Sequence, residues 1–163
     1  MISQVSADEL VSLTRRLVSI PSHCNVPTRE EEVVRELCKF LEEHDLSYKL
    51  QEVDGERSNI IVRLPGTGSG RSLALNGHLD TVPPYNMNFD PFAAEVKDNK
   101  IFGRGTVDMK GPIATMIMAM LAFKRAGIKL KGDLFLQVCW PRKQQAMDAK
   151  CLLNQDLKWT EQL

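Results

Sequence analysis

The sequence has few aromatic residues and no excess of either charge. Aromatic residues make up 6% of its 163 residues, and 21 Lys and Arg balance 21 Asp and Glu. A balanced charge without a run of basic residues argues against a polyanion-binding surface, so nucleic acid is not expected as a partner. Hydrophobic residues (43%) and charged residues (26%) are otherwise in the proportions of an ordinary globular domain.

Long apolar segments and a recognisable leader are also missing from the sequence. The longest apolar run, 113–123, is well short of the roughly 20 residues that a membrane span needs. The first residues include Asp8 and Glu9, where a secretory signal would carry basic residues. These features predict a cytoplasmic protein that does not enter a membrane.

Two patterns that would indicate redox or nucleotide chemistry are incomplete. The sequence contains no C-x-x-C pair, so buried free thiols are the simplest interpretation of its cysteines. These cysteines are Cys24, Cys38, Cys139 and Cys151. The glycines of Gly66-x-Gly68-x-Gly70 separate two predicted strands instead of opening a helix, so they do not predict a dinucleotide site.

Helices and strands are predicted to alternate along most of the chain. Two amphipathic helices begin at the capping boxes Ser6-x-x-Glu9 and Thr28-x-x-Glu31, and they end at Pro21 and near His44-Asp45. Strands are predicted at 48–53, 59–64, 72–76 and 133–138, with a hairpin turning at Asp98-Asn99. The methionine-rich helix 113–126 is apolar nearly all round and should lie buried against the sheet. This alternation is typical of an α/β domain.

The first candidate site is the pair His78 and Asp80, which stands where an apolar strand ends. Residues two apart on a strand face the same way, and ligand sites of α/β sheets lie at such strand ends. A neutral imidazole is a good zinc ligand, and a nearby carboxylate can fix its tautomer. Taken alone, the pair is more often a structural hydrogen bond. The other histidines, His23 and His44, are expected to have surface roles.

The second candidate site is Asp108, in Gly103-Arg-Gly-Thr-Val-Asp-Met-Lys-Gly111. This segment lies between the predicted hairpin and the buried helix, and its glycines permit unusual backbone angles. An anion is favoured near a helix N-terminus. Asp108 is therefore either a simple N-cap or a second metal-binding group.

These segments resemble the signature blocks of a known family. Gly77-His-Leu-Asp-Thr-Val-Pro83, Asp90-Pro-Phe92 and the segment 103–111 are similar to those of the zinc-dependent aminoacylase, acetylornithine deacetylase and succinyl-diaminopimelate desuccinylase family. The general pattern agrees from about 10 to 138. The resemblance implies a zinc-exopeptidase-like three-layer α/β sandwich with a mixed sheet. It also implies that the sandwich is incomplete, with 1–140 as the N-terminal portion of the catalytic domain.

The same resemblance implies a function and a role for each candidate residue. The expected reaction is metal-dependent hydrolysis of the amide bond of an N-acyl amino acid or small peptide. The expected cofactor is a pair of zinc ions, with cobalt as the alternative metal. His78 would be a terminal metal ligand, Asp108 the carboxylate that bridges both ions, and Asp80 the partner that orients His78.

The sequence departs from the family after the strand at 133–138. In the family a Glu-Glu pair follows this strand and supplies the general base and a zinc ligand. Here Cys139-Trp-Pro-Arg-Lys143 follows, and the next acidic residue is Asp148. The tail 141–163 matches nothing in the family, and neither the later ligands nor the lid domain that often mediates dimerisation can be placed. The alternative is therefore an inactive remnant or a non-catalytic binding protein, and little activity is expected of this chain alone.

Overall fold

A computed structural model describes residues 4–54 and 57–139 of the chain. The elements, in chain order, are α1 (Ala7–Val18), α2 (Glu31–Glu43), β1 (Tyr48–Asp54), β2 (Arg57–Leu64), β3 (Leu73–Gly77), β4 (Glu95–Lys97), β5 (Lys100–Phe102), the wide turn η2 (Thr106–Lys110), α3 (Gly111–Arg125) and β6 (Leu134–Val138). Their order and approximate bounds confirm the predicted alternation. The atypical tail 141–163 lies outside the described residues.

The main sheet is mixed, as predicted, and has the strand order β1-β2-β6-β3. β2 runs antiparallel to both of its neighbours, whereas β3 and β6 run parallel. In the parallel pair Gly77 lies opposite Val138, so both strands end at the same end of the sheet. Side chains that follow β3 therefore emerge beside those that follow β6.

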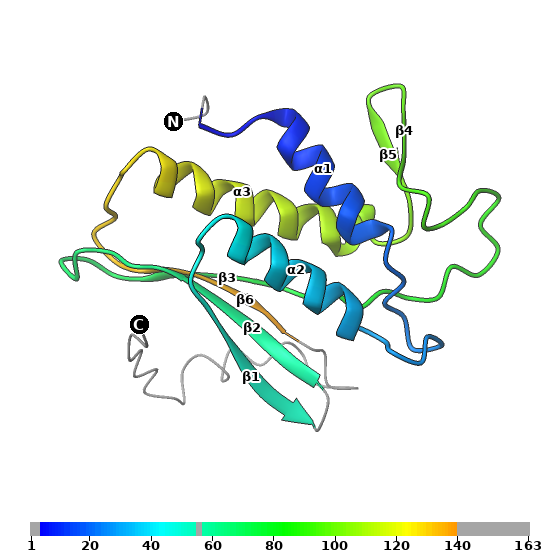
Figure 1. Ribbon diagram of the computed structural model, residues 1–163, viewed down its shortest axis with the longest axis horizontal. Helices are drawn as coiled ribbons and strands as arrows, with labels where there is room; N and C mark the ends of the chain where they lie inside the picture. Colours follow the sequence, from blue (N-terminus) through cyan, green and yellow to red (C-terminus); the bar gives the residue numbers. More distant parts are fainter. Residues whose placement is uncertain (1–3, 55–56, 140–163) are drawn as a thin grey trace.

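The three long helices lie together on one face of this sheet (Figure 1). The core between helices and sheet consists of fully buried apolar side chains contributed by every layer. Among them are Leu13, Leu37, Ile60, Ile117 and Leu136. Of the three layers that the resemblance implies, the described residues build a sheet and one helical layer, so the fold is the predicted partial α/β sandwich.

Helix α3 is the most deeply embedded of the helices. Its buried side chains include Ile113, Ile117 and Met120, and the helix contacts α1 and the strands β3 and β6. The stretch 106–125 is long and apolar enough to cross a membrane by those two criteria, which core helices of soluble proteins also meet. Its packing here is that of a core helix.

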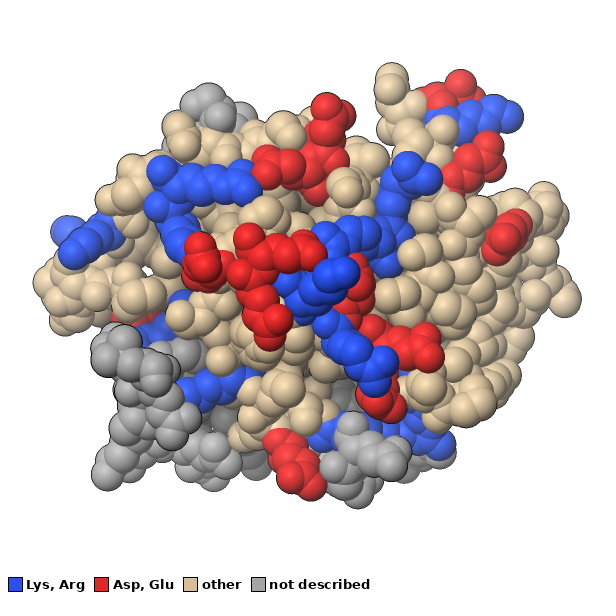
Figure 2. Space-filling model, viewed as in Figure 1, with Lys and Arg blue, Asp and Glu red and all other residues tan. Residues whose placement is uncertain are grey.

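The outer surface of α1 and α2 carries interspersed charges of both signs (Figure 2). Arg16 of α1 pairs with Glu36 and, at 2.9 Å, with Glu43 of α2. These ion pairs join the two helices across their exposed sides. Opposite charges thus lie side by side on this face and do not form a patch of one sign.

The two predicted capping boxes have different outcomes. At α1 the box is confirmed, because Ser6 Oγ accepts from the Glu9 N–H and the Glu9 carboxylate accepts from the Ser6 N–H. At α2 it is wrong, because the helix begins after Glu30 and the Thr28 hydroxyl does not cap it. Arg29 adopts a left-handed conformation (φ 45°), which breaks the helical path between Thr28 and α2.

The predicted hairpin turn is confirmed. β4 and β5 pair antiparallel on either side of Asp98-Asn99. Both turn residues are left-handed, with φ of 51° and 57°. A two-residue hairpin turn of this hand requires positive φ at both positions, which Asp and Asn tolerate.

Candidate functional site

The structure brings His78, Asp80 and Asp108 together. His78 Nδ1 lies 3.0 Å from Asp80 Oδ1 and 3.1 Å from the Asp80 carbonyl oxygen. On the other side of the ring, His78 Nε2 lies 3.2 Å from Asp108 Oδ1. Each ring nitrogen therefore faces one of the two carboxylates.

The prediction that His78 and Asp80 share one face of a strand is wrong. β3 ends at Gly77, so both residues lie beyond the strand and do not share a strand face. The chain turns after Gly77, and the turn directs the Asp80 carboxylate and carbonyl to the same imidazole nitrogen. A loop at the end of the sheet, rather than strand alternation, forms the pair.

Asp108 is not the N-cap of α3, so the interpretation of this residue as a simple cap is wrong. The capping position is occupied by Lys110, and it makes no side-chain capping bond. Asp108 has a non-helical backbone (φ −127°, ψ 94°), and its peptide bond to Met109 is cis. Its side chain is 85% exposed. The carboxylate is thus held away from the helix and toward the solvent beside His78.

The charges around His78 are unbalanced in favour of the acids. The Asp80 carboxylate beside the ring, with a smaller contribution from Asp108, raises the pKa of His78 to about 9, although partial burial opposes this. Within the part of the chain that the structure describes, neither acid forms an ion pair with a lysine or arginine. An imidazole between two such carboxylates attracts a cation, and a proton and a metal ion compete for the same nitrogen.

The donor atoms suit a zinc-type ion in kind, although not in number. Imidazole nitrogen and carboxylate oxygen are ordinary zinc ligands, and a carboxylate on the second ring nitrogen is the usual support for a histidine ligand. His78 Nε2 and Asp108 provide the first two, and Asp80 provides the support. Among residues 4–54 and 57–139, no group of three or more His, Cys, Asp or Glu is arranged to hold a metal. A catalytic zinc site uses three protein ligands.

Lys110, which no sequence pattern singled out, ends the turn that carries Asp108. Its side chain is fully buried, and its Nζ donates a hydrogen bond of 2.6 Å to the Ile20 carbonyl. Burial lowers the pKa of Lys110 to about 7, against the opposing effect of the Asp80 charge. One signal was present in the sequence: a lysine just before a helix stands where an anion would be favoured.

Two predictions about residues outside the group His78, Asp80 and Asp108 are wrong in part. His23 is not a surface residue, because it is only 9% exposed, pairs through its backbone with Thr81 and stacks on Phe92. Among the cysteines, Cys38 is buried as expected, but Cys24 is exposed. The loop that follows α1 pairs with the loop after β3 at Thr81, and there His23 is buried while Cys24 is exposed.

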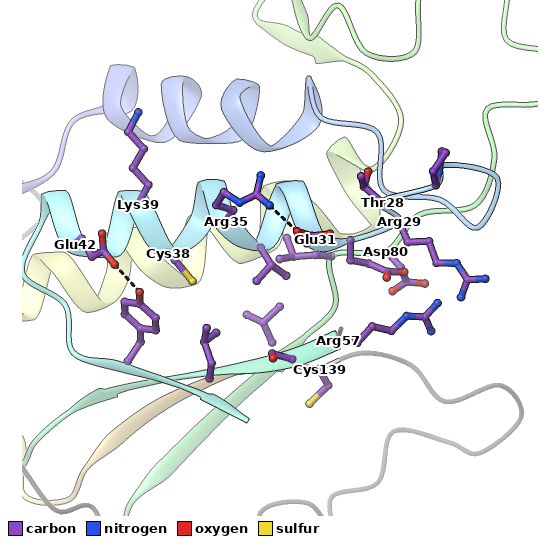
Figure 3. Close-up of a pocket in the computed structure, with 18 residues that line it drawn as sticks. Thr28, Arg29, Glu31, Arg35, Cys38, Lys39, Glu42, Arg57, Asp80 and Cys139 are labelled. Carbon is purple, nitrogen blue, oxygen red and sulfur yellow. Dashed lines mark hydrogen bonds and ion pairs between the residues drawn. The ribbon is translucent and has the colours of Figure 1, made fainter. Parts of the chain in front are cut away.

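A cavity of about 660 Å³ lies between α2 and the sheet and reaches the candidate site. Asp80 and Cys139 line it at the end where β3 and β6 finish, together with Arg29 and Arg57 (Figure 3). Its apolar wall includes Val34, Leu79 and Val138. The cavity is large enough for a small-molecule ligand.

The architecture is that of metallopeptidase catalytic domains. Human carnosine dipeptidase 1 shares the fold with a TM-score of 0.71 at 20% identity, over 93% of this chain and 35% of that chain. A Bacillus subtilis protein described as a dinuclear metal-binding peptidase of the M20 family matches with a TM-score of 0.54 at 21% identity, over 80% of this chain and 34% of that one.

Sequence comparison agrees with the fold and identifies the family. Residues 74–138 match peptidase family M20/M25/M40, and the chain belongs to this family. A probable succinyl-diaminopimelate desuccinylase of Staphylococcus epidermidis is 32% identical over 130 residues, which are 77% of this chain and 31% of that protein. The chain therefore spans about a third of the length of this relative.

Proposed function

We propose that the chain carries one part of a two-metal centre for hydrolysing an amide bond in an N-acyl amino acid or small peptide. The arrangement of His78 supports this proposal, because its Nε2 faces Asp108 at 3.2 Å while Asp80 contacts its Nδ1. Zinc is the expected ion, with cobalt as the alternative, because nitrogen and carboxylate donors suit both.

The three residues have different roles in this proposal. Asp80 accepts the proton of His78 Nδ1, which leaves the lone pair of Nε2 free for a metal ion. Asp108, whose exposed carboxylate lies beside His78 Nε2, would also hold the metal pair. When bound, a pair of metal ions polarises the scissile carbonyl and lowers the pKa of a water molecule. The protein's contribution is to fix the positions of the donor atoms.

The proposed substrates are small. A desuccinylase and a dipeptidase are among the proteins that this chain resembles, and both names describe hydrolysis of an amide bond in a small molecule. The cavity beside Asp80 has the volume for such a substrate. We place the protein in the cytoplasm, without a nucleic-acid or membrane partner.

A second candidate function is metal binding without catalysis. It is favoured by the segment after β6, where Cys139-Trp-Pro-Arg-Lys143 provides neither a general base nor a carboxylate ligand. The described residues also supply only two such ligands, whereas a catalytic zinc site uses three. For the 163-residue chain alone we therefore propose metal binding with little or no turnover.

Zinc titration and hydrolysis assays on the same chain test both proposals. Isothermal titration calorimetry should detect zinc binding that His78→Ala and Asp108→Ala abolish. N-succinyl and N-acetyl amino acids and dipeptides should remain intact when incubated with the zinc-loaded chain. Turnover that Asp108→Ala removes would establish catalysis and overturn the non-catalytic alternative. A wild-type chain that binds no zinc would overturn the metal centre itself.

A further inference from the structure

The segment 20–23, between α1 and α2, contacts both of the loops that carry the candidate ligands. Toward the His78 loop, Ser22 Oγ donates to the Leu79 carbonyl at 2.7 Å, and the Thr81 N–H donates to the Ser22 carbonyl at 3.1 Å. Toward the Asp108 loop, the Ile20 carbonyl accepts from Lys110 Nζ at 2.6 Å. One short segment thus bonds to the loop 78–81 and to the loop 103–110.

These bonds lie at buried or partly buried positions. Ser22 and Lys110 are fully buried, and Thr81 is 8% exposed. A broken bond at such a place leaves a buried polar group without a partner, which costs more than the same loss at the surface. The segment 20–23 is therefore held firmly against both loops.

The two loops also contact each other through Gly105. Its φ is 86°, and a Cβ at this position would lie 2.8 Å from Thr81 Cγ2 and 3.2 Å from Lys110 Cδ. No larger residue fits between the two side chains without displacing one of them. The backbone of the Asp108 loop consequently lies directly against the His78 loop.

We propose that segment 20–23 fixes the position of the His78 loop relative to the Asp108 loop, and that Lys110 is the positioning residue that fastens it. The part of this inference that concerns metal affinity rests on the proposed function. The part that concerns the loops does not, because it follows from hydrogen bonds within the chain itself.

A purely structural role would not require a lysine at position 110. Enclosing an ammonium group in the protein interior is costly, and an apolar side chain of similar length often serves stability as well or better. Lys110 is nevertheless wholly enclosed, and its Nζ donates to the Ile20 carbonyl at 2.6 Å. This bond joins the Asp108 loop to segment 20–23.

Lys124 provides a matched control for Lys110. Its Nζ also donates to backbone carbonyls, those of His44 (2.8 Å) and Asp45, but it lies at the C-terminal end of α3, away from the candidate site. Lys110→Met and Lys124→Met thus remove the same kind of bond at the two ends of one helix. Ser22→Ala removes the second fastening of the segment without changing any charge.

Amide hydrogen exchange in the metal-free chain is the first test. The Thr81 amide should exchange at least about tenfold faster in Lys110→Met and in Ser22→Ala than in the wild-type protein, and at the wild-type rate in Lys124→Met. Equal exchange of Thr81 in Lys110→Met and Lys124→Met would overturn the inference. Thermal melts of each variant identify one that fails to fold, and Ser22→Ala keeps the test decisive if Lys110→Met fails.

Zinc affinity is the second test. Lys110→Met should weaken zinc binding by about 10- to 100-fold, as changes behind a metal ligand commonly do, while Lys124→Met should leave it unchanged. Unchanged affinity in Lys110→Met would overturn the role of Lys110 as a positioning residue for the metal. If the wild-type chain binds no zinc, the proposed function fails, and the exchange experiment still decides whether segment 20–23 positions the loops.

Discussion

The acidic side chains at the two ends of the main sheet have different partners. At the far end, formed by the loops 65–72 and 126–133, Asp133 pairs with Arg63 at 2.9 Å and accepts the Gly66 N–H at 2.8 Å. At the site end, formed by the loops 78–81 and 103–110, the histidine contacts two carboxylates. The far end satisfies an acid with a cation and an amide, whereas the site end leaves Asp108 85% exposed.

This difference separates groups that stabilise the fold from groups available for function. Both ends join loops by hydrogen bonds between segments distant in the sequence. Only at the site end, among the described residues, are acids gathered around a histidine without an arginine or lysine ion pair. Acids that lack a cationic partner are expected where a site binds a ligand.

The largest expected effect comes from exchanging the acid at either end for its amide. Asp108→Asn should weaken zinc binding by more than about 100-fold, because a lost ligand should cost more than the 10- to 100-fold of a supporting residue. Asp133→Asn should leave zinc affinity unchanged. Calorimetric titration of both variants measures the contrast, and similar losses in the two would remove the distinction between the ends.

A glycine at each end allows the packing of the loops to be compared. Gly105 and Gly68 both have positive φ, 86° and 77°, but a Cβ on Gly68 would meet nothing within 4 Å. Gly68→Ala should therefore cost only backbone strain, about 1–2 kcal/mol. Gly105→Ala should cost about 1–3 kcal/mol more, because it also overpacks Thr81 and Lys110.

Urea denaturation of the two glycine variants gives their free energies of unfolding. Gly105→Ala should in addition weaken zinc binding, since it separates the two loops at the site end. Equal destabilisation by the two substitutions would show that the loops at the site end have room to move.

The next effect concerns stability without any ligand. Asp133→Ala should lower the free energy of unfolding by about 2 kcal/mol, because it removes a charged acceptor from Arg63 and from a backbone N–H. Asp108→Ala should stay within about 0.5 kcal/mol of the wild-type value, as exposed substitutions usually do. Chemical denaturation in the presence of a chelator measures both. A large loss in Asp108→Ala would mean that the exposed acid has a structural role.

The smallest effect is expected at an ion pair away from both ends, which provides a baseline for exposed charges. Hydrogen bonds from Arg125 and Ser6 lower the pKa of Glu9 from its ordinary 4.5 to about 2. A pKa lowered by folding stabilises the protein above the unfolded value, so this contribution is complete above pH 4.5 and is lost as pH falls toward 2.

Glu9→Gln tests that baseline. Its destabilisation at neutral pH should be below about 1 kcal/mol, because the pair is partly exposed and screened by solvent. The difference in melting temperature between this variant and the wild type should shrink between pH 4.5 and 2. A difference that does not change with pH would assign the stabilisation to something other than the carboxylate charge.

Sequence patterns predicted the regular parts of the fold well. The hydrophobic periodicity of α1 and α2, the continuous apolar run of α3 and the Asp98-Asn99 turn are local properties, so the sequence shows them without the tertiary structure. The α2 cap failed because the conformation of Arg29 depends on the loop that precedes the helix. A capping motif specifies residue types but does not specify the backbone conformation of the loop before the helix.

The candidate site could be predicted in part, for a related reason. His78 and Asp108 carry motif-level signals, and the structure places them 3.2 Å apart. The burial of His23 and Lys110 depends on segment 20–23 crossing two loops that are distant in the sequence. No local pattern encodes such a crossing, so a surface role was expected for His23 and no role for Lys110.

The parallel pairing of β3 and β6 makes position 139 a suitable place to introduce an additional carboxylate. The Cys139 N–H donates to the Gly77 carbonyl at 2.8 Å, which locks the backbone there beside the residue that precedes His78. A carboxylate grafted by Cys139→Glu would need no new loop to stand at the same rim. One codon change could thus raise the number of donors around the histidine, and graded substitutions there would measure how much metal affinity each added oxygen provides.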